Sequence, residues 1–269
     1  DIDFGVVPLH IIVGENDYID DDKIDLTAMQ ENLSSYKGKT STSSPSPHEW
    51  ENAFGDADVV FCITITSSLS GTYNSAVIAK DIYEQNHAGR KVYVLDSLST
   101  GPEIALFIEK IAELIKAGFA PDDIYKTLLE YKDKTHLYFS LASLNNFAKN
   151  GRISPVIAAG IGLLGVRVVG KASDEGTLLP LDKCRGEKRA LKKLIDHLKE
   201  CGYTDGKIII AHNNNEAGAL ELKKLIENTF GIFNGTIQKT RALCSYYAEP
   251  ESLLIGFEAS LCNHKPYKD

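Results

Sequence analysis

Apolar runs of strand length alternate with longer amphipathic segments along the first half of the chain. The predicted strands are residues 6–13, 59–65 and 92–95. The predicted helices are residues 30–36, 47–54, 73–83, 103–116 and 121–132. Strands separated by helices of this length are typical of βαβ units, so this half of the chain is predicted to contain a parallel sheet.

The second half shows a different pattern. A helix is predicted over residues 141–150, and Ser154 followed by Pro155 is typical of the start of another. Asp174, Glu175 and Gly176 form a plausible hairpin turn between two short apolar segments. Those segments are residues 166–171 and 177–181, followed by helices at 187–200 and 216–230 and strands at 207–211 and 252–259.

This change of pattern predicts two domains. An N-terminal α/β domain with a parallel sheet would occupy residues 1–136, and an α+β domain would occupy residues 137–269. The length of 269 residues fits either two such domains or one large one.

Charge and composition narrow the possible partners. The net charge of −8 disfavours nucleic acid, which requires a basic surface. No apolar run approaches the roughly 20 residues of a membrane-spanning helix, so stable membrane insertion is not expected. The five cysteines are scattered, odd in number and without a CxxC pair. They are therefore predicted to be reduced and mostly buried, in a cytoplasmic protein.

Two clusters of hydroxyl residues are the strongest chemical feature. One covers residues 40–47, and the other follows the predicted strand 59–65 and surrounds Gly71. A strand, a hydroxyl-rich turn and a helix in this order bring unpaired backbone N–H groups and side-chain hydroxyls to one place. Such a place suits a carboxylate or a phosphate, because a helix N-terminus also carries partial positive charge. The clusters predict a cleft that holds an anion.

Other interpretations of the serines remain open. The protein could be a serine-dependent hydrolase, in which Ser67, Ser68 or Ser70 acts as the nucleophile with His212 as its base, although the chain has no GxSxG motif. The plainest alternative is a turn whose hydroxyls only cap a helix. The histidines show no HxH or HExxH pair, so no metal site is predicted.

Residues 160–165 read GIGLLG and match the spacing of a dinucleotide fingerprint. That fingerprint follows a strand and opens a helix. Here the glycines close a predicted helix and precede a strand, so close helix packing is the better interpretation.

Several motifs together resemble the DegV family, the fatty-acid-binding proteins that serve bacterial fatty acid kinase. Residues 42–47 read TSSPSP and are similar to the TSQPSP signature of the family. Residues 67–76 read SSLSGTYNSA and are close to its SSxLSGTYxSA loop. Matching residues also occur at 96–97, 151–154 and 185–190. The resemblance covers almost the whole chain, and the motifs follow in the same order.

The resemblance implies a two-domain α/β protein that holds a fatty acid between its domains. Thr42 and Ser70 would bind the carboxylate of the lipid. Ser43, Ser67 and the backbone of Gly71 would line the same place. The protein would need no cofactor other than its lipid ligand and would not itself be a catalyst.

Further residues carry implied roles in a polar network and at a partner surface. Arg152 would belong to a polar network near the head group. Arg185, Lys188 and Arg189 would face the catalytic subunit of the fatty acid kinase, which phosphorylates the presented carboxylate.

The sequence also departs from the family pattern. The opening strand of the family, with its TDS-type motif, would precede Asp1, and Tyr247 stands where the family has a histidine. A divergent paralogue that binds another amphiphile is therefore an alternative to a fatty acid carrier.

Overall fold

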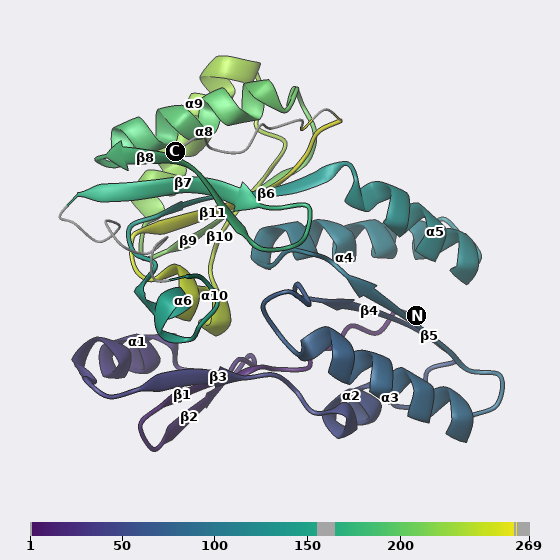
Figure 1. The fold of residues 1–269 in the computed structure, drawn as a ribbon. Coiled ribbons are helices and arrows are strands. Elements are labelled where there is room, and N and C mark those ends of the chain that lie inside the picture. Colours follow the sequence, from purple (N-terminus) through teal and green to yellow (C-terminus); the bar gives the residue numbers. More distant parts are fainter. Residues whose placement is uncertain (1, 155–164, 261, 263–269) are drawn as a thin grey trace.

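The computed structural model describes residues 2–154, 165–260 and 262, and its largest element is a sheet of six strands. The order of the strands is β10-β9-β11-β6-β7-β8, with β10 and β9 parallel and all other neighbours antiparallel (Figure 1). The strands are β6 (Thr135–Leu141), β7 (Val166–Ala172), β8 (Leu178–Arg185), β9 (Ile208–Asn213), β10 (Gly235–Lys239) and β11 (Ser252–Glu258).

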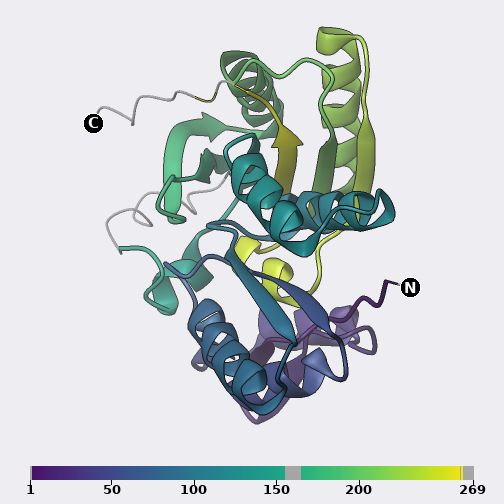
Figure 2. The same ribbon diagram turned by 90° about the vertical axis from the view of Figure 1, so that its right-hand side faces the viewer.

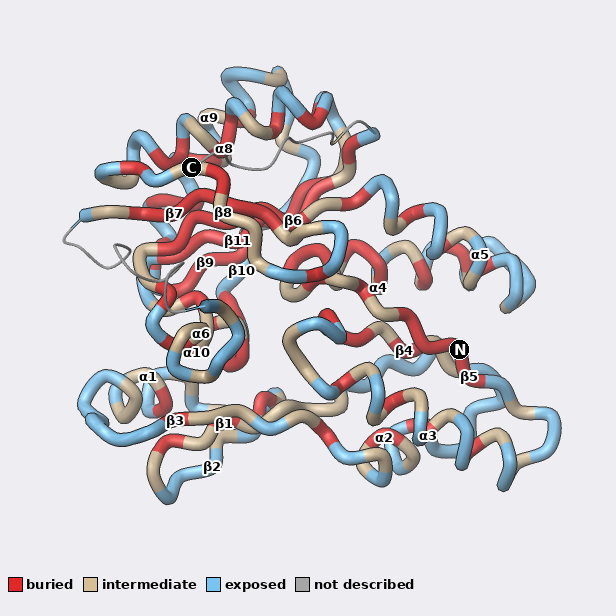
Figure 3. The backbone as a smooth tube through the Cα atoms, in the orientation of Figure 1, coloured by how far each residue is buried: buried red, intermediate tan, exposed pale blue. Residues whose placement is uncertain are grey.

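Helices cover both faces of this sheet, which explains why its inner strands β6, β9 and β11 are almost entirely buried (Figures 2 and 3). On one face lie α8 (Glu187–Glu200) and α9 (Glu216–Phe230), and on the other α4 (Gly101–Lys116) packs against β9 and β11. Next to α4 lies α5 (Pro121–Lys132). Alternate residues of β6 and β11 belong to different core clusters, as expected for strands with a period of two.

The N-terminal part of the chain contains two smaller sheets. An antiparallel sheet has the order β2-β1-β3, and a parallel pair joins β4 to β5. These strands are β1 (His10–Val13), β2 (Asn16–Ile19), β3 (Thr40–Ser43), β4 (Val59–Thr64) and β5 (Lys91–Asp96). The helices beside them are α1 (Leu26–Ser35), α2 (Pro47–Phe54) and α3 (Thr72–Asn86).

Two short helices lie side by side near the middle of the molecule. They are α6 (Asn145–Lys149) and α10 (Ala242–Ala248). Although α10 belongs to the C-terminal half of the sequence, it packs against β1 and α1 of the N-terminal half as well as against α6 and β9. The two halves therefore share α10 as a common structural element.

The predicted α/β class is confirmed, with a parallel pair, a larger mixed sheet and a β7–β8 hairpin that turns at Asp174, Glu175 and Gly176. The division near residue 136 stays a prediction, and β6 begins at Thr135. The helix predicted over residues 141–150 is wrong in part, because residue 141 ends a buried strand and only Asn145–Lys149 is helical. Of the GIGLLG motif, residues 160–164 lie outside the described residues.

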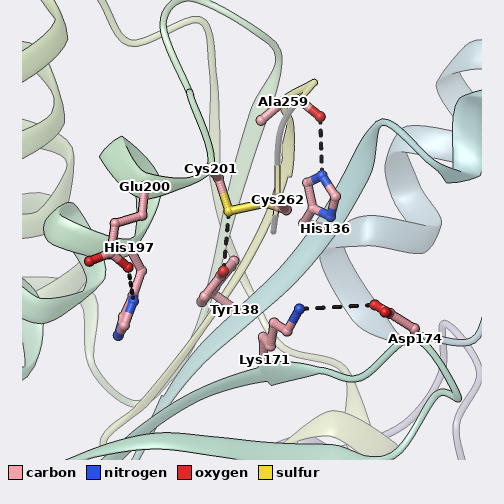
Figure 4. The surroundings of a disulfide bond; sticks show 9 residues. All are labelled: His136, Tyr138, Lys171, Asp174, His197, Glu200, Cys201, Ala259 and Cys262. Atoms are coloured by element: carbon pink, nitrogen blue, oxygen red, sulfur yellow. Dashed lines mark hydrogen bonds and ion pairs between the residues drawn. A yellow bond between two sulfur atoms is a disulfide. The ribbon is translucent and has the colours of Figure 1, made fainter. Parts of the chain in front are cut away.

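The prediction that all five cysteines are reduced is wrong, because Cys201 and Cys262 form a disulfide (Figure 4). An odd number of cysteines excludes a framework in which every cysteine is paired, but it does not exclude a single disulfide. Cys201 directly follows α8 as its C-cap residue, and the chain after β11 returns to the same side of the sheet, so two distant cysteines meet. Tyr138 lies beside them, with its hydroxyl 3.2 Å from the sulfur of Cys201. Cys62, Cys184 and Cys244 are free thiols.

Candidate ligand-binding site

A cavity of about 320 Å³ lies between the six-stranded sheet and the N-terminal sheets. This volume is within the range of small-molecule sites, which is roughly 300–1,000 Å³. Apolar side chains contribute most of its wall. They are Leu9, Ile65, Leu69, Leu98, Leu137, Phe139, Leu141, Phe147, Ala172, Leu178, Leu243, Ala248 and Leu254.

Most of the buried apolar side chains of this wall come from the six-stranded sheet. Leu137, Phe139 and Leu141 alternate along β6, so they lie on the same face of the sheet. Leu254 of β11 and Leu178 of β8 extend the same apolar surface. These side chains can make only hydrocarbon contacts with a ligand and provide no strong polar partner. This part of the cavity therefore suits an alkyl chain.

Hydroxyl groups from both halves of the chain also line the cavity. The hydroxyl of Thr42 on β3 is hydrogen bonded to that of Tyr247 on α10 at 2.7 Å. The ring of Phe147 packs against Tyr247, with 4.8 Å between the ring centroids. Burial raises the pKa of Tyr247, while the bond to Thr42 and the charge of Arg152 lower it. Tyr247 therefore stays protonated near neutral pH and can donate a hydrogen bond to an anion.

The start of α3 adds further donors to this place. Ser70 and Gly71 line the cavity, and Gly71 is the N-cap residue of α3, without a side-chain cap. The hydroxyl of Ser70 is hydrogen bonded to that of Thr72 at 2.7 Å. The hydroxyl oxygen of Ser44 is 3.4 Å from the position that a Cβ atom on Gly71 would occupy. The two hydroxyl clusters of the sequence thus meet at the cavity, beside a helix N-terminus that favours an anion.

The β7–β8 hairpin closes another side of the cavity. Its turn contacts the loop after β4, where the hydroxyl of Thr66 donates to the carbonyl of Gly176 at 2.8 Å and that of Ser68 donates to the carbonyl of Glu175. Gly176 has φ +77°, and a Cβ atom there would lie 2.1 Å from the Thr66 hydroxyl. Only glycine fits this turn without displacing the loop.

The structure places most of the predicted head-group residues together. Thr42, Ser43, Ser70, Gly71 and Arg152 all line the cavity. Arg152 and Ser43 are exposed, which indicates that this polar end is close to solvent.

Ser67, the sixth predicted residue, does not line the cavity. Its side chain is exposed, and its backbone N–H donates to the carboxylate of Asp96 at 3.1 Å. The same carboxylate accepts from the N–H of Leu98 at 3.0 Å, so Asp96 joins the two loops that follow β4 and β5. Ser67 therefore lies in a loop whose neighbours form the site.

The predicted partner surface lies around the turn from β8 into α8. Arg185, Lys188 and Arg189 are all exposed there. Gly186, which has φ +83°, makes the sharp turn between them.

In the described part of the chain, the structure does not place a histidine base beside the serines that a hydrolase would use as its nucleophile. Among the described residues, no histidine lines the cavity. His212 is buried in β9, where its ring accepts a hydrogen bond from the N–H of Asn215 at 3.3 Å. Desolvation lowers its pKa, yet none of the candidate serines is its hydrogen-bond partner in the described structure.

The described residues contain neither a candidate metal site nor a candidate membrane span. No group of three or more His, Cys, Asp or Glu side chains there is arranged to hold a metal ion. In the same part of the chain, no helix combines the length and apolar character needed to cross a membrane.

A buried carboxyl group lies close to the cavity wall. Glu103 of α4 is 4% exposed and accepts a hydrogen bond from the hydroxyl of Thr135 at 2.8 Å. Burial raises its pKa to about 7, and the neighbouring Ser99, Thr135 and Lys132 partly offset this effect. Ser99 lines the cavity, so Glu103 lies just behind its wall.

Sequence reasoning missed several residues of the site. Tyr247 is predicted only to stand where the family has a histidine, with no role at the head group. Phe147, Leu254 and Leu178 carry no local signature, because an apolar residue that lines a cavity looks like any core residue in the sequence.

Comparisons with known proteins agree with this architecture. The sequence model of the DegV family, described as "Uncharacterised protein, DegV family", matches residues 1–260. A DegV domain-containing protein of Streptococcus pneumoniae is 40% identical over 255 residues, which cover 95% of this chain and 91% of the relative.

Two solved structures share both sequence and fold. A DegV family protein from Eubacterium eligens, loaded with heptadecanoic acid, is 40% identical to this chain and has a TM-score of 0.92. The match covers 94% of this chain and 92% of the Eubacterium eligens chain. The Fatty Acid Kinase (Fak) B3 protein of Streptococcus pneumoniae, loaded with linoleic acid, has the same identity and TM-score. Here the match covers 94% of this chain and 90% of the Streptococcus pneumoniae chain. A family match over nearly the whole chain and relatives at this identity lead to one conclusion: the chain belongs to the DegV family.

Proposed function

We propose that this protein binds one long-chain fatty acid and presents its carboxylate to a fatty acid kinase. One observation carries the proposal: an apolar cavity meets the hydroxyls of Thr42, Ser70 and Tyr247 beside Arg152. The fatty acids bound by the relatives from Eubacterium eligens and Streptococcus pneumoniae support the same class of ligand.

The tail of the lipid supplies most of the affinity. Burying about 14 methylene groups at roughly 0.8 kcal/mol each contributes on the order of 11 kcal/mol before the costs of ordering the ligand. The polar groups therefore need only orient the carboxylate and satisfy its oxygens. Thr42 and Ser70 hold it in this proposal, with Ser43, the Gly71 backbone and Tyr247 around it and Ser67 in the supporting loop.

The neutral character of most donors suits a carboxylate that must react. A hydroxyl donor stabilises the anion less than a bidentate arginine, so the oxygen keeps more of its nucleophilic character toward a phosphoryl donor. Thr42→Ala is expected to retain lipid while losing phosphorylation by the kinase. A variant that is phosphorylated as fast as the wild type would contradict this role of Thr42.

We place the kinase at the surface of Arg185, Lys188 and Arg189, and the pair of proteins in the cytoplasm. The exposed cluster provides three positive charges on an otherwise acidic protein, and complementary charge speeds association. Reversing these charges to glutamate should slow phosphorylation of bound fatty acid and leave lipid content unchanged. Equal phosphorylation rates at low salt would show that the kinase docks elsewhere.

Uptake of a defined lipid tests the binding function itself. Delipidated protein titrated with heptadecanoic acid should bind one equivalent. If the protein binds none, the result would favour the alternative in which this chain is a divergent paralogue that binds another amphiphile.

A further inference from the structure

A buried carboxylate directly after β2 links the two halves of the chain near the site. Asp20 is 9% exposed and accepts hydrogen bonds from the first two N–H groups of α10. One oxygen accepts from Ala242 at 3.0 Å, and the other accepts from Leu243 at 3.0 Å. Both oxygens of the carboxylate thus satisfy N–H groups that a helix cannot satisfy itself.

Asp20 is itself held in place by its surroundings. Its backbone N–H donates to the carbonyl of Leu9 at 2.9 Å, and Leu9 lines the cavity. The guanidinium of Arg241 donates to the backbone carbonyl of Asp20 at 3.2 Å and also bonds the carboxylate of Asp22 at 2.7 Å. Asp20 is therefore a fixed anchor rather than a mobile surface carboxylate.

The other end of α10 carries the polar groups of the site. Tyr246 and Tyr247 are hydrogen bonded to Thr40 and Thr42, each at 2.7 Å, and both threonines lie on β3. Because β2 and β3 flank β1 in one sheet, that sheet holds α10 at both ends. The helix has only seven residues, and so short a helix depends on such contacts for its position.

We propose that Asp20 is a positioning residue for head-group recognition. It fixes the N-terminus of α10 so that the Tyr247 hydroxyl, five residues further on, meets Thr42 and the carboxylate of the ligand. This inference rests on the proposed fatty acid binding. Part of the affinity for the ligand carboxylate is thereby assigned to Asp20, which lies outside the cavity lining.

The substitution Asp20→Asn tests the assignment. An amide has one acceptor oxygen, and its NH₂ group would face one of the two backbone N–H groups. The affinity of the delipidated protein for heptadecanoic acid is expected to fall about fivefold, because a displaced Tyr247 loses part or all of the hydrogen bond that its hydroxyl donates to the ligand. Asp22→Asn is the matched control, because it removes the same charge from the same loop without touching the N–H groups of α10. It should bind within about twofold of the wild type, since exposed ion pairs contribute little.

A double-mutant cycle separates positioning from a general loss of stability. If Asp20 acts through Tyr247, the variant Asp20→Asn/Tyr247→Phe binds no more weakly than Tyr247→Phe alone. The inference would be overturned if the two substitutions lowered the affinity by the product of their separate effects. It would also be overturned if the Asp20→Asn protein bound heptadecanoic acid like the wild type. If the wild type takes up no heptadecanoic acid, the proposed function falls together with this inference.

A measurement on the wild type covers the case in which Asp20→Asn does not fold. Hydrogen exchange of the Ala242 and Leu243 amides should slow when heptadecanoic acid binds, because the ligand fixes the other end of α10. Unchanged exchange at these two amides in a protein that has bound the ligand would overturn the inference.

Discussion

The hydroxyl oxygens of Thr42 and Tyr247 lie 2.7 Å apart, although 205 residues separate them in the sequence. This bond joins β3 to α10 at the polar end of the cavity. It brings Thr42, which is predicted to bind the carboxylate, into contact with Tyr247.

Removing the Tyr247 hydroxyl should weaken binding without emptying the cavity. Tyr247→Phe keeps the ring that packs on Phe147 but loses one donor, so the affinity for heptadecanoic acid should fall about fivefold to tenfold. Tyr36→Phe is the control, because Tyr36 is exposed and lies outside the cavity lining. Equal affinities for all three proteins, measured by titration of delipidated samples, would exclude Tyr247 from the head-group site.

The turn of the β7–β8 hairpin should tolerate no side chain at Gly176. Gly176→Ala combines a positive φ with a Cβ atom 2.1 Å from the Thr66 hydroxyl. Gly89→Ala is a matched control, since Gly89 also has a positive φ but has no atom within 4 Å of its Cβ position. The control should lose roughly 1 kcal/mol of unfolding free energy in urea, and Gly176→Ala about twice that or more. Similar losses would show that the loop after β4 moves freely away from the hairpin.

The buried carboxyl of Glu103 should make stability depend on pH. Its pKa is about 7 in the folded protein, against 4.5 as its ordinary value, because burial disfavours the charged form. Between these values the folded state keeps a proton that the unfolded chain has released, so this contribution to stability is lost as the pH rises. The full difference is on the order of 3 kcal/mol.

Glu103→Gln provides the test of this effect. The amide oxygen can still accept from Thr135, but it does not titrate. Urea unfolding at pH 4.5 and pH 8 should therefore show a larger loss of stability for the wild type than for the variant. Parallel pH profiles would mean that Glu103 does not change its protonation state over this range.

The Cys201–Cys262 disulfide should stabilise the protein under oxidising conditions. It spans 61 residues, and closing a loop of that length restricts the unfolded chain by about 4 kcal/mol in the entropic description. A thiol reductant, which imitates the cytoplasm, should lower the Tm of the wild type. It should leave the Tm of Cys201→Ser/Cys262→Ser unchanged. An oxidised wild type with the Tm of this variant would contradict a stabilising bond.

Local signals explain which elements could be predicted from the sequence. The helix Pro47–Phe54 has the bounds that are predicted from the sequence, and in the structure Ser46 and Glu49 form a capping box at its start. The helix Pro121–Lys132 also begins at a proline, which fixes its first turn. The strand Val59–Thr64 and its hydroxyl loop were visible for a similar reason, as an apolar run ends abruptly in polar residues.

The parts that could not be predicted depend on distant contacts. The hydroxyl-rich strand Thr40–Ser43 pairs with β1, and its composition alone is typical of a loop. The helix Ala242–Ala248 is held by Asp20, Thr40 and Thr42, which lie some 200 residues away in the sequence. The disulfide and Tyr247 were missed for the same reason, because each acquires its role only from a partner that folding brings near.

Native mass spectrometry of the purified protein, followed by extraction of its lipid, tests the central claim most directly. The wild type should carry one fatty acid per chain, and Ala172→Trp, which fills part of the cavity, should carry none. Leu220→Trp should keep the lipid, because Leu220 is 54% exposed on α9. A wild type that is empty and takes up no added heptadecanoic acid, or a fatty acid retained in Ala172→Trp, would contradict binding in this cavity.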